Sequence, residues 1–506
     1  MEERENKHIA SRIIFFVLIA LGMIGFWAAV WYKSVYGDVG FDAVIYALTS
    51  DAGSVESKLM MTYVFRGLIP AVVGTLGVYS FLFFCPLKKE KREEKGRKFL
   101  VPHKVAVWVS SGLVAALIIS GALYSGLVKW AYLSLNETDI YMHEHVDPTD
   151  VEIKFPEQRR NLIYIYMESM ETTFLSEELD GGVKYNLIPE LHQLATENVN
   201  FSHNDFVGGG RTLSGTTWTV GALVAHTSGL PLKFTIDLNG SVDGGQYDNF
   251  LPGVTTITDV LAKDGYYQTF MFGSDGEYGG RKQYFEQHGV DKVYDLYTAY
   301  DDGIVPRGYW EWWGMEDKYL IEYAKQEILK VSQMDQPFAF NMLTVDTHHI
   351  DGFLCTDCEK NYSSQYNNVI ACSSKRIAEF VEWIKQQDFY ENTTIVITGD
   401  HCSMDEGYIS EHMREDYTRR VYNCIINPAP GLSKEHTKNR EFATIDMFPT
   451  TLAALGCEIE GNHLGLGVNL FSGEETLCER TDFNKLSDEL AKHSNFYSEN
   501  FMKKKK

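Results

Sequence analysis

Three long apolar stretches stand near the beginning of the chain. Residues Ile13–Tyr32, Gly67–Leu87 and Val105–Val128 contain no charged side chain. As helices, each is long enough to cross a hydrocarbon core of about 30 Å. We expect the first stretch to be retained as an anchor, because two more follow it and no small-residue cleavage site marks its end. The pattern predicts three transmembrane helices rather than the alternative, a helical hairpin in a soluble core.

After these stretches, short apolar runs alternate with segments of helical period. The runs at 161–167, 338–345 and 393–398 are rich in β-branched and aromatic residues and predict buried strands. Residues 317–334 and 374–387 repeat apolar positions with helical spacing. Continuously apolar strands that alternate with helices indicate an α/β domain with a mainly parallel sheet covered by helices.

The same patterns predict the division of the chain. No low-complexity tract or long linker interrupts the part after the apolar stretches. We expect a membrane region at 1–128, a connecting segment at 129–158, a catalytic domain at 159–473 and a C-terminal tail at 474–506.

Lysine and arginine residues predict the orientation in the membrane. The loop 88–104 carries eight of them, whereas segment 33–66 carries three. Basic residues near a span favour the cytoplasmic side, so we expect the loop inside and the large domain on the extracytoplasmic side of the cell membrane.

Charge and cysteine content narrow the partners. A net charge of −23 argues against nucleic acid as a partner, because nucleic-acid binding requires a basic surface.

Seven of the eight cysteines follow residue 128, where an extracytoplasmic location favours disulfides. For Cys355 and Cys358 in "CTDC", a disulfide cluster is favoured over zinc, because no second ligand pair lies nearby. Seven is odd, so at least one thiol stays free or pairs with another molecule.

Polar side chains follow each of the three predicted strands, and ligands bind at the carboxyl ends of such strands. These side chains are Glu168 after the first, Asp346, His348 and His349 after the second, and Asp400 and His401 after the third. Carboxylates with an imidazole suit Mn²⁺ or Zn²⁺ better than Ca²⁺. The alternative is an ordinary polar turn at each strand end.

A glycine-rich segment, 208–232, leads through serine and threonine hydroxyls into a small-residue helix. Backbone N–H groups at a helix start favour a phosphate. A hydroxyl on a metal ion becomes a nucleophile near neutral pH, although threonines here could instead be helix caps. Metal, hydroxyl and phosphate cradle together indicate phosphoryl chemistry.

Seven motifs resemble, in the same order, those of the lipoteichoic acid synthases and phosphoglycerol transferases in the alkaline phosphatase and sulfatase superfamily. They are "NLIYIYMES", "GTTWT", "GRKQYFEQHGVDKVYD", "WWGMEDKYL", "TTIVITGDHCSM", "RRVYNCIINP" and "ATIDMFPTTLAALG". The resemblance implies an alkaline-phosphatase-like α/β fold for the domain that follows the membrane region.

The resemblance also implies one divalent metal ion held by Glu168, Thr216, Asp400 and His401. Mn²⁺ is favoured, with Zn²⁺ and Mg²⁺ as alternatives.

Thr216 is the expected catalytic nucleophile, because the superfamily places a small hydroxyl residue three positions later, here Thr219. Thr212 and Thr217 remain alternatives.

Four further residues are expected to bind substrate. His348 and, less directly, His349 match the family's substrate-contacting histidine, although Ile350 replaces the proline of its His-x-Pro pattern. Trp313 is expected to pack on the glycerol unit, and Arg211 to pair with phosphate. The alternatives are a core or rim tryptophan and a solvent-facing arginine.

The function that the resemblance implies is transfer of glycerophosphate from phosphatidylglycerol, through a threonine-linked intermediate, to a cell-envelope glycan or polyglycerolphosphate. Phosphoethanolamine transfer and metal-dependent phosphodiester hydrolysis are alternatives within the superfamily. A non-catalytic exterior receptor or scaffold is the alternative from another class. The Cys-x-Pro-Ser-Arg pattern of sulfatases is absent from residues 208–232, which argues against sulfate-ester hydrolysis.

Overall fold

The computed structural model describes residues 2–37, 40–49, 57–84, 103–233, 235–236, 242–243 and 249–503. The chain divides into two units. The first comprises Met1–Phe41 and Ser54–Tyr132, and the second comprises Asp42–Gly53 and Leu133–Lys506.

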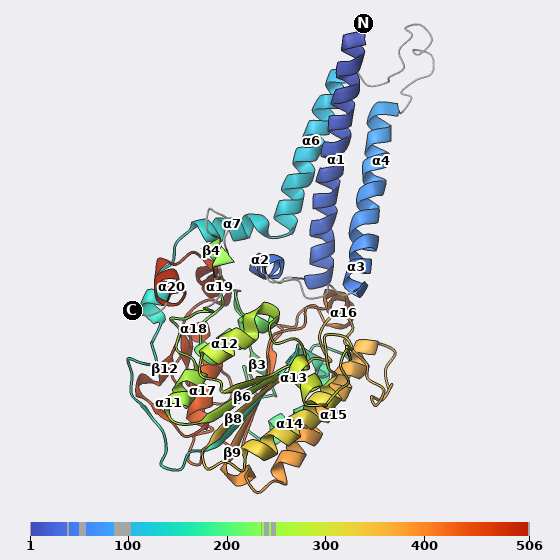
Figure 1. The fold of residues 1–506 in the computed structure, drawn as a ribbon. Coiled ribbons are helices and arrows are strands. Elements are labelled where there is room, and N and C mark those ends of the chain that lie inside the picture. The colour runs from blue at the N-terminus through green and yellow to red at the C-terminus, as the bar shows by residue number, and fades with distance from the viewer. Residues whose placement is uncertain are drawn as a thin grey trace. The chain divides into compact units, whose positions relative to one another are not determined.

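The first unit is built on helices α1 (Glu2–Tyr36), α4 (Ile69–Phe84) and α6 (His103–Tyr124), which run side by side (Figure 1). Three helical segments, Ile13–Tyr36, Met60–Leu82 and Val107–Tyr124, are long and apolar enough to cross a membrane, as predicted. Most of the predicted cytoplasmic loop 88–104 lies outside the described residues.

Apolar side chains of this unit face outward. Ile14 is 57% exposed, Val73 62% and Ile118 59%. Such a surface is costly in water and favourable in lipid, so its burial pattern supports the membrane assignment made from composition.

The second unit is built on a seven-stranded sheet in the order β3-β10-β9-β2-β8-β6-β7. Its strands are β2 (Asn161–Met167), β3 (Gly209–Gly210), β6 (Tyr267–Phe272), β7 (Lys292–Tyr294), β8 (Phe338–Leu343), β9 (Thr393–Gly399) and β10 (Val421–Ile426). The five strands from β9 to β7 are parallel, whereas β10 is antiparallel to both β9 and β3. The predicted α/β class and mainly parallel sheet are confirmed.

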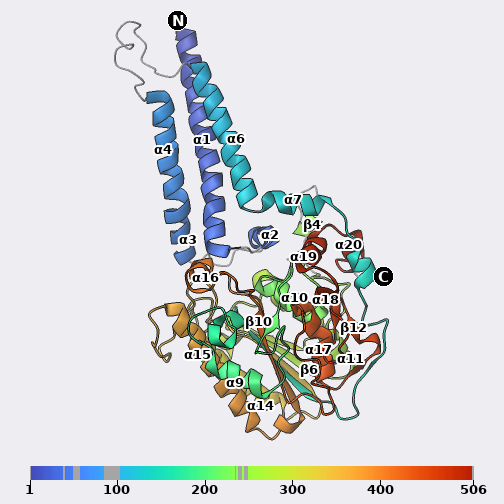
Figure 2. The ribbon, with the colours of Figure 1, turned by 180° about the vertical axis from the view of Figure 1, so that it is seen from behind.

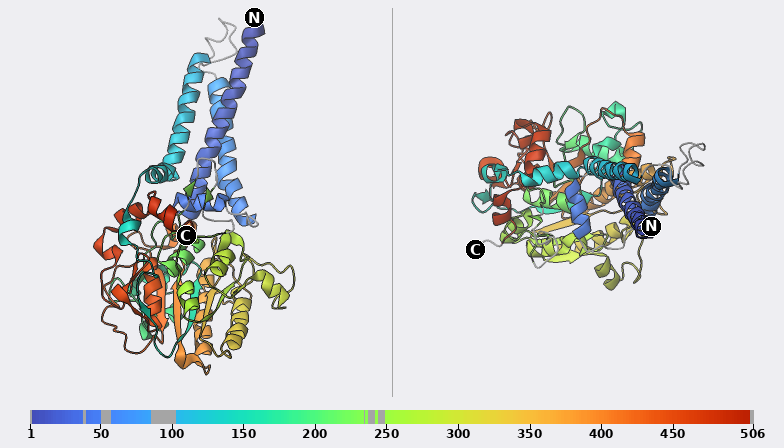
Figure 3. Two further views of the ribbon diagram at one scale, coloured as in Figure 1. Left: turned by 60° about the vertical axis from the view of Figure 1, so that its left-hand side comes forward. Right: turned by 90° about the horizontal axis from the view of Figure 1, so that it is seen from above.

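Two layers of helices cover the sheet (Figures 2 and 3). On one face, α9 (Pro189–Glu197), α14 (Asp317–Val331) and α15 (Gln365–Lys385) pack on alternate strand residues such as Ile163 and Ile165. On the other face, Tyr166 contacts His226 of α10 (Thr219–Ser228), and Phe270 contacts Phe285 of α12 (Arg281–Gln287). Burial on both faces explains why these strands are continuously apolar.

The other helices and short strands are distributed over the two units. The helices are α2 (Phe41–Thr49), α3 (Ser57–Tyr63), α7 (Leu127–Leu135), α8 (Ile140–Glu144), α11 (Ile257–Lys263), α13 (Leu296–Asp301), α16 (Glu406–His412), α17 (Met447–Ala454), α18 (Leu477–Arg480), α19 (Phe483–Ala491) and α20 (Asn495–Asn500). Short two-residue strands are β1 (Ile153–Lys154), β4 (Thr235–Ile236), β5 (Val242–Asp243), β11 (Glu458–Ile459), β12 (His463–Leu464) and β13 (Gly467–Val468).

The segment predicted as a C-terminal tail contains α18, α19 and α20. Arg440 donates to Glu479 at 2.7 Å, and Thr138 donates to Glu489 at 3.0 Å. These contacts fasten the segment to the rest of the second unit.

Candidate functional site

Neighbouring strands bring the predicted metal ligands together. Glu168 follows β2 at the centre of the sheet, and Asp400 and His401 follow β9 beside it. The N–H groups of Ser169 and His401 donate to Asp400 Oδ1 at 2.8 and 2.7 Å, so the two strand ends are joined directly. The parallel register thus places residues far apart in sequence at one sheet edge.

The three side chains converge in the interior. His401 Nε2 lies 3.5 Å from Glu168 Oε1 and 3.4 Å from Asp400 Oδ2. One ligand atom from each of the three residues lies within 4.8 Å of the others, and all three residues are buried. Three potential ligand atoms therefore face one small space.

The ring of His401 is oriented for metal binding. Its Nδ1 lies 2.9 Å from the carbonyl oxygen of Cys402, to which it donates when protonated there. That tautomer leaves the lone pair of Nε2 directed at the carboxylates. Among the described residues, Asp400 Oδ2 is buried without a hydrogen-bond partner. An imidazole lone pair, two carboxylates and an orphaned oxygen fit a divalent cation.

The electrostatics of the site point the same way. Burial and then the negative charge of Glu168 raise the pKa of Asp400 to about 8. Burial lowers the pKa of His401, but the Asp400 and Glu168 charges outweigh it, and the net pKa is raised. A bound cation would favour the charged forms of the two buried carboxylates.

Thr219, not Thr216, places its hydroxyl at this cluster. Thr219 is the first residue of α10, and its Oγ1 lies 3.3 Å from Glu168 Oε2 and 3.3 Å from His401 Nε2. Thr216 is fully buried, and its Oγ1 donates to the Leu213 carbonyl at 3.0 Å and accepts from the Leu213 N–H at 2.9 Å. The predicted placement of Thr216 on the metal is corrected: its hydroxyl closes a tight turn, whereas Thr219 is partly exposed.

The turn before α10 depends on glycine. Gly215 has φ +82°, and a Cβ there would lie 2.7 Å from the Leu232 carbonyl oxygen. The Leu232 N–H donates to the Gly215 carbonyl at 3.0 Å. This close approach sets the start of α10, where free N–H groups and the helix dipole favour a phosphate beside Thr219.

The histidines after β8 form a stack with a tryptophan. The His348 ring lies 4.3 Å from the Trp313 ring and 4.5 Å from the His349 ring, centroid to centroid. His348 is partly exposed and His349 is buried. Burial lowers the pKa of both rings, and the charge of Glu168 opposes this only for His348. His348 is therefore neutral near pH 7 and can accept a proton there.

Arg211 is placed differently. Its guanidinium lies over the ring of Phe483, 3.5 Å from the centroid, in a cation–π contact. Burial lowers its pKa. The structure thus gives Arg211 an aromatic partner, and its predicted contact with phosphate stays a prediction.

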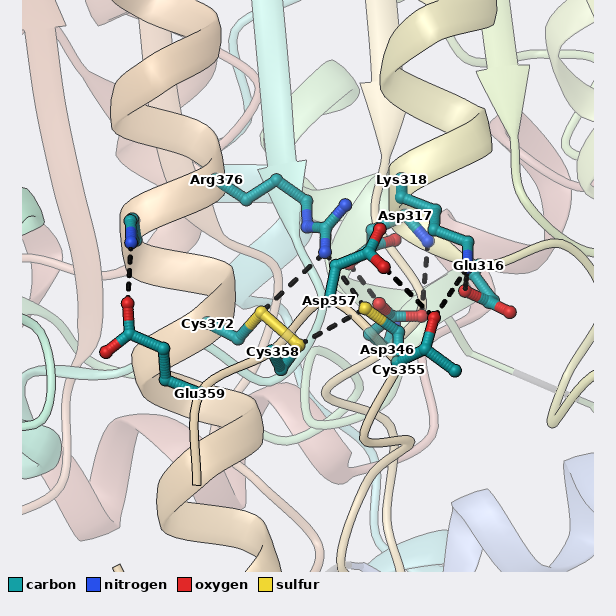
Figure 4. The surroundings of a disulfide bond; sticks show 12 residues. Glu316, Asp317, Lys318, Asp346, Cys355, Asp357, Cys358, Glu359, Cys372 and Arg376 are labelled. Carbon is teal, nitrogen blue, oxygen red and sulfur yellow. Dashed lines mark hydrogen bonds and ion pairs between the residues drawn. A yellow bond between two sulfur atoms is a disulfide. The ribbon is translucent and has the colours of Figure 1, made fainter. Parts of the chain in front are cut away.

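Asp346 does not join the cluster. It pairs with Asp317, the first residue of α14 (Figure 4). The Asp317 N–H donates to Asp346 Oδ1 at 3.2 Å, and the Val345 N–H donates to Asp317 Oδ1 at 2.7 Å. Burial raises the pKa of Asp317 to about 6 and, with the Asp317 charge, also raises that of Asp346. These two carboxylates therefore accept hydrogen bonds from backbone N–H groups.

An ion pair that the sequence patterns did not indicate joins the loops that carry Glu168 and His401. Glu171, three residues after Glu168, accepts from the Ser403 N–H at 3.0 Å and from Arg419 Nε at 2.9 Å. Arg419 also donates to the Ser403 carbonyl at 2.7 Å. Arg419 lies within the quoted motif "RRVYNCIINP" and Glu171 lies two residues after "NLIYIYMES", but only the fold shows that they meet. We call Glu171 and Arg419 the loop clamp.

Comparisons with known proteins find relatives across the chain. The sequence model of the sulfatase family, described as "Sulfatase", matches residues 160–457. Phosphoglycerol transferase I of Salmonella arizonae is 28% identical over 462 residues, which are 88% of this chain and 54% of the relative. That of Xanthomonas euvesicatoria is 28% identical over 375 residues, 70% of this chain and 50% of the relative. The chain spans about half the length of the curated relatives it matches.

Among solved structures, a lipoteichoic acid synthase from Listeria monocytogenes has 16% sequence identity and a TM-score of 0.49. The alignment covers 63% of this chain and 79% of the other.

Proposed function

The chain belongs to the sulfatase family, and from this premise we propose that it is a membrane-anchored phosphoglycerol transferase. Its donor would be phosphatidylglycerol, and its acceptor a cell-envelope glycan or polyglycerolphosphate. One observation carries the proposal: the Thr219 hydroxyl stands at a helix N-terminus between Glu168 and His401. The relatives named as phosphoglycerol transferases support the choice of head group.

Glu168, Asp400 and His401 would hold one divalent ion, with Mn²⁺ favoured and Zn²⁺ or Mg²⁺ as alternatives. When bound, such an ion would lower the pKa of a neighbouring hydroxyl and offset negative charge on phosphoryl oxygens.

The proposed transfer has two steps. In the first, Thr219 Oγ1 forms a bond to phosphorus and the bond from phosphorus to the diacylglycerol oxygen breaks. His348, neutral by its lowered pKa, takes up a proton released in the attack and returns it to the leaving oxygen. In the second, an acceptor hydroxyl displaces Thr219 from phosphorus, and Thr219 regains its proton. A covalent intermediate divides one difficult displacement into two easier ones.

The other substrate contacts follow from position. The N-terminus of α10 would bind the phosphoryl group. Trp313, stacked on His348, would pack on the glycerol unit. The apolar helices of the first unit would keep the protein in the bilayer that contains its donor, with the second unit on the extracytoplasmic side.

Mass spectrometry of the full-length protein in detergent tests the proposal. After incubation with phosphatidylglycerol and Mn²⁺, we expect a glycerophosphate adduct on the tryptic peptide 212–233, with fragmentation assigning it to Thr219. Thr219→Ala should abolish the adduct, and Thr216→Ala, the matched control, should keep it.

Other outcomes would contradict parts of the proposal. An adduct on Thr216 would restore the original assignment of the nucleophile. An adduct formed only from phosphatidylethanolamine would show phosphoethanolamine transfer. Release of glycerophosphate into water without an adduct would show a phosphodiesterase, and no reaction with any lipid would favour the receptor or scaffold.

A further inference from the structure

Three sulfur atoms, those of Cys355, Cys358 and Cys372, meet between the β8–α15 connection and α15 (Figure 4). A disulfide joins Cys358 to Cys372 of α15, which bears out the predicted preference for a disulfide over zinc. The free thiol of Cys355 lies with its Sγ 3.3 Å from Cys358 Sγ. A thiol at contact distance from a disulfide sulfur is in position to attack it.

We propose that Cys355, Cys358 and Cys372 form a thiol–disulfide exchange site. The deprotonated Cys355 sulfur attacks Cys358 Sγ, a Cys355–Cys358 bond forms, and the Cys358–Cys372 bond breaks. Cys372 leaves as a thiolate and takes up the proton that Cys355 released. One disulfide and one thiol are present before and after, so the exchange needs neither oxidant nor reductant.

Arg376 favours this exchange. One turn after Cys372 on α15, its Nη2 lies 3.0 Å from Cys355 Sγ and 3.7 Å from Cys372 Sγ. A single guanidinium thus faces both the attacking and the leaving sulfur, and it stabilises negative charge on either. The same positive charge disfavours a metal cation among the three sulfurs, even though their spacing would admit one.

The local backbone also brings the attacking and attacked residues together. The Cys358 N–H donates to the Cys355 carbonyl at 3.2 Å, so both lie in one turn. A bond between them closes a short ring within this turn. The bond to Cys372 instead fastens the turn to α15.

The two bonded forms differ in what they constrain. The turn follows the segment that carries His348 and His349 out of β8. With Cys358 bonded to Cys372, this connection is covalently tied to α15. With Cys358 bonded to Cys355, the tie is absent, and the connection is held by non-covalent contacts alone.

The two bonded forms also differ in which free thiol is accessible to water-soluble reagents. Cys355 is 1% exposed, whereas Cys372 is partly exposed. Trypsin cleaves after Lys360 and Lys375, which separates Cys355 and Cys358 from Cys372. The Cys358–Cys372 form therefore yields two cross-linked tryptic peptides, whereas the Cys355–Cys358 form yields one peptide with an internal disulfide.

The test is disulfide mapping of the full-length folded protein, incubated with iodoacetamide without reductant and then denatured in acid. We expect carboxamidomethyl Cys372 together with an internally bonded Cys355–Cys358 peptide, both increasing with time. Cys355→Ser, the control that lacks the attacking thiol, should leave Cys372 unlabelled. Arg376→Gln should slow labelling of Cys372 by roughly tenfold.

Wild-type protein alone can overturn the proposal. If Cys372 stays unlabelled over hours at pH 7 and pH 8.5, and Cys355 reacts only after denaturation, there is no exchange. If Cys355→Ser labels Cys372 as fast as wild type does, the attacking group is not Cys355. The assay measures bonding and not turnover, so it does not depend on the proposed transferase activity.

Discussion

Two buried acidic pairs lie at the same edge of the sheet and differ in the groups that their carboxylate oxygens contact. In the backbone-bound pair, Asp317 and Asp346 accept main-chain N–H groups, including that of Asp317 itself. In the cluster, Asp400 Oδ2 has no hydrogen-bond partner among the described residues, and His401 Nε2 faces both carboxylates. Both pairs are buried.

The difference separates a structural role from a chemical one. A carboxylate whose oxygens accept backbone N–H groups fixes the path of the chain and needs no further ligand. A buried carboxylate oxygen without a hydrogen-bond partner destabilises the fold unless a cation binds it. Burial alone would have assigned both pairs to one class, and the identity of their partners distinguishes them.

Removal of the Thr219 hydroxyl beside the cluster is expected to have the largest effect. Thr219→Ala should lower diacylglycerol release by about 10⁴-fold or more, because it removes the proposed nucleophile. Thr216→Ala should retain turnover and lose about 1 kcal/mol of stability, since its hydroxyl bonds only the Leu213 backbone. Lipid turnover and urea unfolding of both variants measure this. Equal loss of turnover in both would contradict the assignment.

The loop clamp is expected to have the next largest effect. Arg419→Met leaves Glu171 buried without its ionic partner, so the free energy of unfolding should fall by roughly 3 kcal/mol. Adding Glu171→Gln should recover part of the loss, because the uncompensated charge is removed. Denaturant titration of both variants measures this. No recovery in the double variant would show that packing, not charge, makes the contribution.

Metal content compares the two pairs directly. Asp400→Asn should weaken Mn²⁺ binding by at least roughly 100-fold, since even indirect ligand partners contribute up to that amount. Asp346→Ala should keep the metal and lose about 1–3 kcal/mol of stability, because the Asp317 N–H loses its acceptor. Metal analysis after matched dialysis decides. Loss of metal from Asp346→Ala would make both pairs part of one site.

The smallest expected effect is a pH dependence. Asp317 titrates near about 3.9 when unfolded, and burial raises its pKa to about 6 in the fold. Its stabilising contribution is therefore complete below the unfolded pKa and is lost as the pH rises through about 6. Relative to Asp317→Asn, wild type should lose stability between pH 4 and pH 6. Unfolding curves at one-unit intervals measure this, and parallel pH profiles would contradict it.

Apolar patterning was sufficient to predict much of the architecture. The three predicted strands match β2, β8 and β9 within two residues at each end, because both faces of each are buried and most of their interior positions are apolar, Asn341 of β8 being polar. Strand β6 was not predicted, since "YQTFMF" begins with polar positions that the sheet buries. Strand β10 lies inside the motif "RRVYNCIINP" and was not predicted as a strand. Its antiparallel direction cannot be read from a single sequence.

At the site, residues directly after strands were predictable and the loop was not. Glu168, Asp400 and His401 meet because three residue types stand at strand ends, which the sequence displays. The sequence does not show which of Thr216 and Thr219 faces the cluster. The choice depends on the positive φ of Gly215 and on the first turn of α10. The loop clamp required knowing that residues 171 and 419 meet across the sheet.

The central place of β2 has a consequence for the order in which the protein becomes competent. Its partner β9 lies more than 200 residues later, as the bond from Ser169 to Asp400 shows. A ribosome that has reached residue 390 has made neither Asp400 nor His401, so the nascent chain lacks two of the three proposed metal ligands. Pairing over such a separation is slow to nucleate. Occupancy of the proposed metal site would therefore report completed synthesis and folding of this sheet.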